Sequence, residues 1–286
     1  MIAGAKRRGR ASSFAFRSFL LLSLIVALTT LAVLVGQVLV DSQGFLDTTL
    51  LTSPPSALPE IAGARPAILA SLYLGALVFL FSVPIGVATA VYLEEYAAKD
   101  RWYNRLLELN IQNLAGVPSI VYGILGLAFL VRGLGLGRTL LAGSLILTLL
   151  VLPTVIIASR EALRSVPSSI RDGAYALGAT PWQVTWRQVL PAAIPGIATG
   201  SILSLSRAIG ETAPLLLVGA TVFVTFDPTP FGDGFSAMPV QIFQYFQRPQ
   251  DEFQTLAAAG VIVMLVVLLA MNSFAIWLRN RYEQTW

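Results

Sequence analysis

Residues 160–191 read REALRSVPSSIRDGAYALGATPWQVTWRQVLP, a polar segment set between two long apolar stretches. Pro167 predicts the start of a first short helix, because proline fits a first helical turn, where amide hydrogens have no intrahelical partner. Thr180 followed by Pro181 predicts the N-cap and first turn of a second helix, which Pro191 is expected to end. An ordinary connecting loop does not carry paired helix signals, so we expect folded structure here.

This segment, called the insert below, is rich in small side chains where its first helix should end. Gly173, Ala174, Ala176 and Gly178 allow another backbone to approach closely. The flanking apolar stretches are long enough to cross a membrane, so the insert lies on the water side of that membrane. We therefore interpret it as a docking element for another protein.

The chain as a whole is too apolar for a water-soluble domain. Its 286 residues are 56% hydrophobic and 12% charged, whereas soluble domains are roughly 45–50% apolar. The apolar runs are continuous rather than alternating, which favours helices over a membrane β-barrel, and helices satisfy their own backbone groups in lipid. The sequence predicts an all-α integral membrane protein with six transmembrane helices. The expected spans are residues 18–40, 66–93, 112–131, 140–159, 194–226 and 256–278.

Basic residues concentrate on one side of this topology. Of the 19 lysines and arginines, 14 precede the first span, follow the last one, or lie between the second and third or the fourth and fifth spans. Because such residues are retained in the cytoplasm, both termini and the insert are expected there, and the net charge of +4 reflects topology rather than nucleic-acid binding. Residues 1–65 should form a cytoplasmic tail, an uncleaved first helix and an external loop, and residues 66–286 one membrane core.

Two connecting segments carry weaker signals. Residues 94–110 begin with Glu94-Glu95 and continue in an amphipathic pattern, which suggests a connector at the membrane surface. Residues 227–254 form an external segment with a short helix expected at residues 240–246. That helix is predicted to lie on the membrane surface or to face an external protein.

Several kinds of chemistry are excluded by what the sequence lacks. It has no cysteine and no histidine, so there is no thiolate or imidazole metal ligand, no disulfide and no Ser-His or Cys-His nucleophile. A phosphate-binding loop of the Gly-x-x-x-x-Gly-Lys-Ser/Thr type is also missing, since Lys6 is followed by Arg7 and Lys99 by Asp100. We expect a non-catalytic subunit that takes its energy from a partner.

Arg207 and Glu211 are two charged residues inside the fifth predicted span. Charge within a membrane is costly, so the two side chains are expected to be buried in the bundle and paired across one helical turn. Ser204 continues the same polar stripe, and Pro214 should kink or open the helix beside the pair. The pair either clamps two helices together or lines the path of an anion, for which the planar arginine fork is well suited.

The spacing within the insert resembles the EAA loop of ABC-importer permeases, in which Glu-Ala-Ala, three residues, Gly, nine residues and Ile-x-Leu-Pro follow one another. The matching positions are Asp172-Gly173-Ala174, Gly178 and Leu190-Pro191, whereas Gln188 stands in place of the isoleucine. Longer runs are similar to the PstA family of phosphate-importer permeases. These runs are VYLEEYA (91–97), NLAGVPSIVYGILGL (113–127), SREALRSVP (159–167), AYALGAT (174–180), LSRAIGETAPLL (205–216) and MPVQIF (238–243).

The PstA resemblance implies a type I, MetI-like importer fold. It also implies a heterodimer with a PstC-like permease, two PstB-like ATPase subunits that bind ATP and Mg, and an external PstS-like phosphate-binding protein. The implied substrate path consists of Arg207, Glu211, Ser204 and Thr212. The implied ATPase contact consists of Asp172, Gly173, Ala174, Tyr175, Ala176, Leu177, Gly178, Ala179, Thr180, Pro181 and Trp182.

Three other functions remain open alternatives. A permease for another oxyanion would share most of these features, and in the sister PstC permeases Met typically follows the Gly-Glu dipeptide where this chain has Thr212. A self-sufficient secondary transporter or channel should show an internal repeat, which the sequence lacks. A membrane enzyme using Glu211 as a base has no convergent acidic cluster or histidine to support it.

Overall fold

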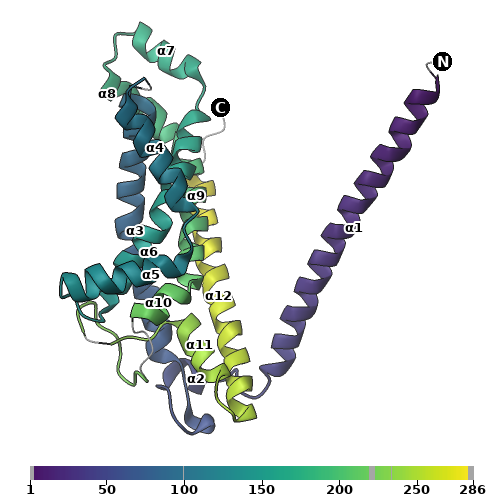
Figure 1. The fold of residues 1–286 in the computed structure, drawn as a ribbon, viewed down its shortest axis with the longest axis vertical. Coiled ribbons are helices and arrows are strands. Elements are labelled where there is room, and N and C mark those ends of the chain that lie inside the picture. Colours follow the sequence, from purple (N-terminus) through teal and green to yellow (C-terminus); the bar gives the residue numbers. More distant parts are fainter. Residues whose placement is uncertain (1–2, 99, 219–222, 233, 283–286) are drawn as a thin grey trace.

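The computed structural model describes residues 3–98, 100–218, 223–232 and 234–282 (Figure 1). Every regular element within these ranges is helical, which confirms the all-α prediction. The long helices are α1 (Ala3–Asp41), α3 (Arg65–Val91), α6 (Leu140–Arg164), α9 (Leu190–Gly210) and α12 (Asp251–Tyr282). The shorter helices are α2 (Thr48–Thr52), α4 (Trp102–Ala115), α5 (Ser119–Gly126), α7 (Ser168–Ala176), α8 (Pro181–Val184), α10 (Ala213–Val218) and α11 (Met238–Phe246). Wider π-helical turns occupy Tyr92–Tyr96, Leu127–Gly133 and Thr185–Val189, and a 3-10 turn occupies Pro59–Ile61.

Five helical stretches are long and apolar enough to cross a membrane. They are Ser13–Asp41, Arg65–Tyr96, Leu140–Arg164, Pro181–Gly210 and Asp251–Arg281. The third expected span, residues 112–131, is not one straight helix: α4 and the α5 segment meet at an angle of 103°. Pro118 explains the break, because proline disfavours helical geometry at the residue before it. In Figure 1, α5 therefore runs across the bundle.

The centre of the bundle is α6, which packs against α3 on one side and α9 on the other. Small residues allow α6 and α9 to approach closely. A Cβ atom built on Gly200 would lie 2.3 Å from the Ala158 methyl carbon, and one built on Gly196 would lie 2.7 Å from that of Ala162. The two alanines of α6 are four residues apart, and so are the two glycines of α9. This is the spacing of small-residue contacts between membrane helices.

The second helix of the insert continues directly into the membrane. α8, the π-helical turn and α9 form one stretch from Pro181 to Gly210, so the expectation that Pro191 ends the insert helix is wrong. Leu190 donates its amide hydrogen to the carbonyl of Thr185, five residues back. A wide turn at this position relieves the clash that a proline makes with the preceding turn of an α-helix.

The same stretch also ends earlier than expected. α9 stops at Gly210 rather than running to residue 226, and the separate helix α10 begins at Ala213, which confirms the expected opening of the helix beside Pro214. Pro214 is the second residue of α10, so the break lies just before the proline. This placement fits a proline, because in the first turn of a helix its missing amide hydrogen costs no intrahelical hydrogen bond.

Helix α1 diverges from the rest of the molecule (Figure 1). Its described side chains are almost all exposed, and most of them are apolar. The N-terminal end of α1, the C-terminal end of α12 and the insert lie at the same end of the structure. An apolar helix with no intramolecular cover requires lipid or another protein around it.

The end opposite the insert is held by an apolar cluster, which we call the apolar end cluster. Its members are Leu50, Ala62, Ala64, Ala67, Met238, Tyr245, Phe253, Leu256, Ala257 and Ala259. Within it, the buried hydroxyl of Tyr245 donates a hydrogen bond of 2.6 Å to the carbonyl of Gly63. The helix expected at residues 240–246 is confirmed as α11, and one of its faces is buried in this cluster.

Candidate functional site

The insert folds as two helices joined by a tight turn. Gly178 lies in that turn with a φ of +79°, a backbone conformation that costs a non-glycine residue strain. Thr180 caps α8 as expected: its hydroxyl accepts from the Gln183 amide, and the Gln183 side chain accepts from the Thr180 amide. This reciprocal capping box fixes where the second helix begins.

Large apolar side chains of the insert point into solvent. Leu177 is 91% exposed, Trp182 is 61% exposed, and Tyr175 is also exposed. The rings of Trp182 and Trp186 lie 5.0 Å apart. Asp172 is exposed as well, so the surface combines an acid with several apolar groups. A patch of this kind at a water-facing end is typical of a protein-docking surface.

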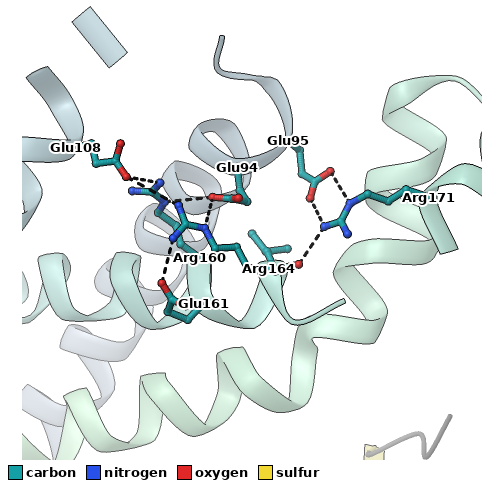
Figure 2. A network of polar contacts seen from close by, with 8 residues as sticks. Glu94, Glu95, Glu108, Arg160, Glu161, Arg164 and Arg171 are labelled. Carbon is teal, nitrogen blue, oxygen red and sulfur yellow. Dashed lines mark hydrogen bonds and ion pairs between the residues drawn. The ribbon is translucent and has the colours of Figure 1, made fainter. Parts of the chain in front are cut away.

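The first insert helix is tied to the bundle by Arg171 (Figure 2). Its guanidinium donates to both carboxylate oxygens of Glu95, at 2.7 and 3.4 Å. It also donates to the carbonyl oxygens of Leu163 at 2.9 Å and Val166 at 2.8 Å. One arginine therefore joins α7 to the turn after α3 and to two carbonyl groups, one in the last turn of α6 and one just beyond it.

A second group of charges lies beside this clamp (Figure 2). Arg160 contacts Glu108 of α4 at 2.7 Å and Glu94 at 3.5 Å. Arg164 contacts Glu94 at 3.0 Å and Glu161 at 3.2 Å. We call these residues together with Arg171 and Glu95 the charge network. It joins α3, α4, α6 and α7.

Sequence reasoning missed the charge network. Residues 94–110 were expected to be a connector at the membrane surface, and Glu94 and Glu95 instead have side chains only 9% and 10% exposed. The available signal was the pair of adjacent acids at the end of an apolar run, together with three arginines around the start of the insert. The spacing of these residues in the sequence did not indicate which acid forms an ion pair with which arginine.

The charged pair of the fifth span lies where α9 ends. Arg207 Nε is 3.4 Å from Glu211 Oε1, which confirms the pairing. The expectation of burial is wrong for Arg207 within this chain, because its side chain is 54% exposed, whereas that of Glu211 is 18% exposed. Glu211 has an extended backbone beyond the last helical turn, so the pair joins an exposed arginine to a partly buried acid at the break after α9.

Two further residues of the expected path differ in position. Ser204 is buried, and its hydroxyl donates to the carbonyl of Gly200 at 2.9 Å. Thr212 lies in the break between α9 and α10, where its carbonyl accepts from the amide of Leu216. Thr212 is therefore at the break, next to Glu211 in the chain. The Ser204 hydroxyl is instead directed toward the backbone of its own helix. Among the described residues, no group of three acidic, histidine or cysteine side chains is placed to hold a metal ion.

The fold and the insert define a class of membrane transport subunit. The model of the family described as "Binding-protein-dependent transport system inner membrane component" matches residues 82–284, and the chain belongs to this family. The solved structure of a bacterial alginate ABC transporter, bound to its alginate-loaded periplasmic protein, contains a chain with the same fold. The TM-score is 0.69 at 19% identity, over 95% of this chain and 96% of that one.

Two relatives of known description show which permeases this sequence resembles. The phosphate transport system permease protein PstA of Mycobacterium leprae is 34% identical over 92% of this chain and 86% of its own length. The probable ABC transporter permease protein YqgH of Bacillus subtilis is 32% identical over 78% of this chain and 73% of its own length. The MetI-like importer fold expected from the sequence is therefore confirmed.

Proposed function

We propose that this chain is the PstA-like permease subunit of an ATP-driven phosphate importer in a bacterial or archaeal cytoplasmic membrane. The observation that carries the proposal is the 34% identity with a phosphate permease over 92% of the chain. The common end of both terminal helices and the insert supports an orientation with all three in the cytoplasm (Figure 1). The concentration of arginines at that end supports the same orientation.

The insert is the proposed contact with the energy source. Leu177 and Trp182 are exposed at its tip, and Asp172 adds an acid beside them. A PstB-like ATPase would seat this surface in a groove, and a second ATPase copy would bind a PstC-like partner permease. ATP and Mg are then bound by the ATPase subunits, and this chain takes no part in hydrolysis.

The exposed Arg207–Glu211 pair is the proposed contribution to the phosphate path. A charged pair on a membrane helix needs cover, and a PstC-like permease packed against this face would provide it and complete the path. The Arg207 fork suits a phosphate oxygen, while the Glu211 carboxylate would accept a hydrogen bond from the hydroxyl group of hydrogenphosphate and repel sulfate, which has no such proton. A PstS-like protein would deliver phosphate from outside.

Assembly provides the first test. The chain is extracted in detergent with its partners, and co-purification of an ATPase subunit is measured together with hydrolysis in the presence of a phosphate-loaded external protein. We expect the ATPase to co-purify and its hydrolysis to rise with the loaded protein. Phosphate movement in vesicles lacking any ATPase would instead support a secondary transporter.

The path is tested by removing both charges. An Arg207→Met, Glu211→Leu double variant should assemble with its partners and fail to move phosphate. Desolvated ion pairs often contribute little net stability, so a structural clamp would tolerate this change. The matched control is Arg65→Met with Asp227→Leu, an ion pair of 2.8 Å whose side chains are each 50% exposed. If the assembled Arg207→Met, Glu211→Leu variant took up phosphate near the wild-type rate, the pair would be a structural clamp and not part of the path.

A further inference from the structure

Glu94 and Glu95 are neighbours in sequence but serve different partners. Both lie in the π-helical turn Tyr92–Tyr96 that ends the α3 span. Glu94 faces Arg160 and Arg164 of α6, whereas Glu95 faces Arg171 of α7 (Figure 2). A single turn at the end of a membrane helix therefore contacts both the central helix and the insert.

The contact between Glu95 and Arg171 is built to resist separation. The side chains are 10% and 21% exposed, and both carboxylate oxygens receive a hydrogen bond. Two further donors of Arg171 are engaged by the carbonyl oxygens of Leu163 and Val166. Pulling α7 away would leave a largely desolvated carboxylate and two helix-end carbonyls without this donor, which costs much more than parting two exposed charges.

The other side of α7 is attached differently. Its C-terminal end leads into the turn at Gly178, where a Cβ atom would meet nothing within 4 Å. Beyond that turn, α7 packs against the π-helical turn Thr185–Val189 through apolar side chains such as Ala174 rather than through a charged clamp, and the second insert helix is continuous with α9. A displacement of α7 therefore has a stiff ionic connection to the end of α3, while the turn at Gly178 can absorb a change of angle toward α9.

We propose that Arg171 and Glu95 are positioning residues that transmit movement of the insert to α3 during transport. The proposal rests on the proposed function, in which an ATPase moves the insert. Two routes would then lead from the insert into the membrane: α8 drives α9 through a continuous helix, and α7 drives α3 through the ionic clamp. Arg160 of α6 contacts both Glu108 of α4 and Glu94 of the turn after α3. Movement of that turn would therefore also reach α4 and α6.

The test uses the complete importer reconstituted in vesicles, with phosphate transported per ATP hydrolysed as the main measurement. Glu95→Gln preserves the shape of the side chain and removes its charge, and Arg171→Lys removes the planar fork. We expect ATPase subunits to co-purify with both variants, and transport per ATP to fall by about fivefold or more, a typical size for coupling between sites.

The matched control is Glu161→Gln. Glu161 is 66% exposed and pairs with Arg164 three residues away on the same helix, so its loss separates no two elements. Transport per ATP should stay at the wild-type value in this variant. The same result for Glu95→Gln and Arg171→Lys would overturn the proposal.

A charge exchange separates transmission from simple folding. In the Glu95→Arg, Arg171→Glu double variant the ion pair is restored, although a carboxylate at position 171 cannot donate to the two carbonyl groups. We expect transport per ATP to recover in part compared with either single charge reversal. If the Glu95→Gln variant and the double variant lost ATPase binding to the same degree, the pair would have a purely structural role, and the proposal would be wrong. Failure of the wild-type importer to bind an ATPase would instead refute the proposed function itself.

Discussion

Both ends of the bundle contain an apolar cluster, which includes Leu163, Val184 and Val189 at the insert end, and the insert end adds a network of charged side chains. At the insert end, the charge network joins four elements through directional contacts in which Arg164 meets Glu94 at 3.0 Å and Glu108 at 3.9 Å. At the other end, the apolar end cluster packs large side chains such as Phe253, which is fully buried. The charge network connects helices through a few long side chains, so these helices can move together while their contacts persist, whereas close-packed apolar groups tolerate little change in shape. The comparison suggests a movable end and a fixed end.

The largest expected effect is at the fixed end. Phe253→Ala removes a fully buried ring and should destabilise the protein by about 3–5 kcal/mol. Thermal unfolding in detergent measures this loss, which should change little with salt because no charge is removed. The matched control is Phe246→Ala, in which the ring is 65% exposed. Equal losses in the two variants would show that the apolar end cluster does not stabilise this end.

An intermediate effect is expected at the movable end. Gly178→Leu places a side chain at a φ of +79°, which costs about 1–2 kcal/mol of backbone strain. There is open space around the Gly178 Cβ position, so the strain should distort the turn rather than the bundle. We expect normal membrane insertion with loss of ATPase co-purification and transport. Gly173→Ala, also in open space but in regular α7, is the control; normal transport by Gly178→Leu would contradict docking through the insert.

The smallest effect concerns one hydrogen bond of the fixed end. Tyr245→Phe removes the donor to Gly63 and should cost about 1 kcal/mol. Burial raises the pKa of Tyr245 above its ordinary value of 10.0. The unfolded chain therefore loses its proton first, so the stability from the neutral hydroxyl is complete below pH 10 and is lost as the pH rises further. Unfolding measured across this range should show a steeper decline for the wild type than for Tyr245→Phe, and parallel curves would contradict it.

Local signals in the sequence were sufficient for most helices and for the form of the insert. Apolar runs placed the long helices, Thr180 marked the start of α8, and Gly178 marked the turn between the insert helices. Prolines were interpreted less well. Pro191 was expected to end a helix and lies within one, because a wide turn before it relieves the clash that a proline causes.

The candidate sites also had one part that the sequence predicted and one part that it did not. Arg207 and Glu211 are four residues apart, so their pairing followed from helical geometry. The exposure of Arg207 did not follow, since it depends on which surfaces of α9 are covered by other helices. The charge network lay outside sequence reasoning for the same reason.

The sequence by itself determined an all-helical membrane protein with a folded polar insert, because apolar length, capping residues and positive-φ glycine act over a few neighbouring residues. Only the tertiary structure decided that α4 and α5 meet at 103°, that α8 continues into α9, and that Glu95 meets Arg171. Glu95 and Arg171 are 76 residues apart in the chain. Their contact arises because α3 and α6 end, and α7 begins, at the same place in space, a property of helix packing that no local pattern of residues contains.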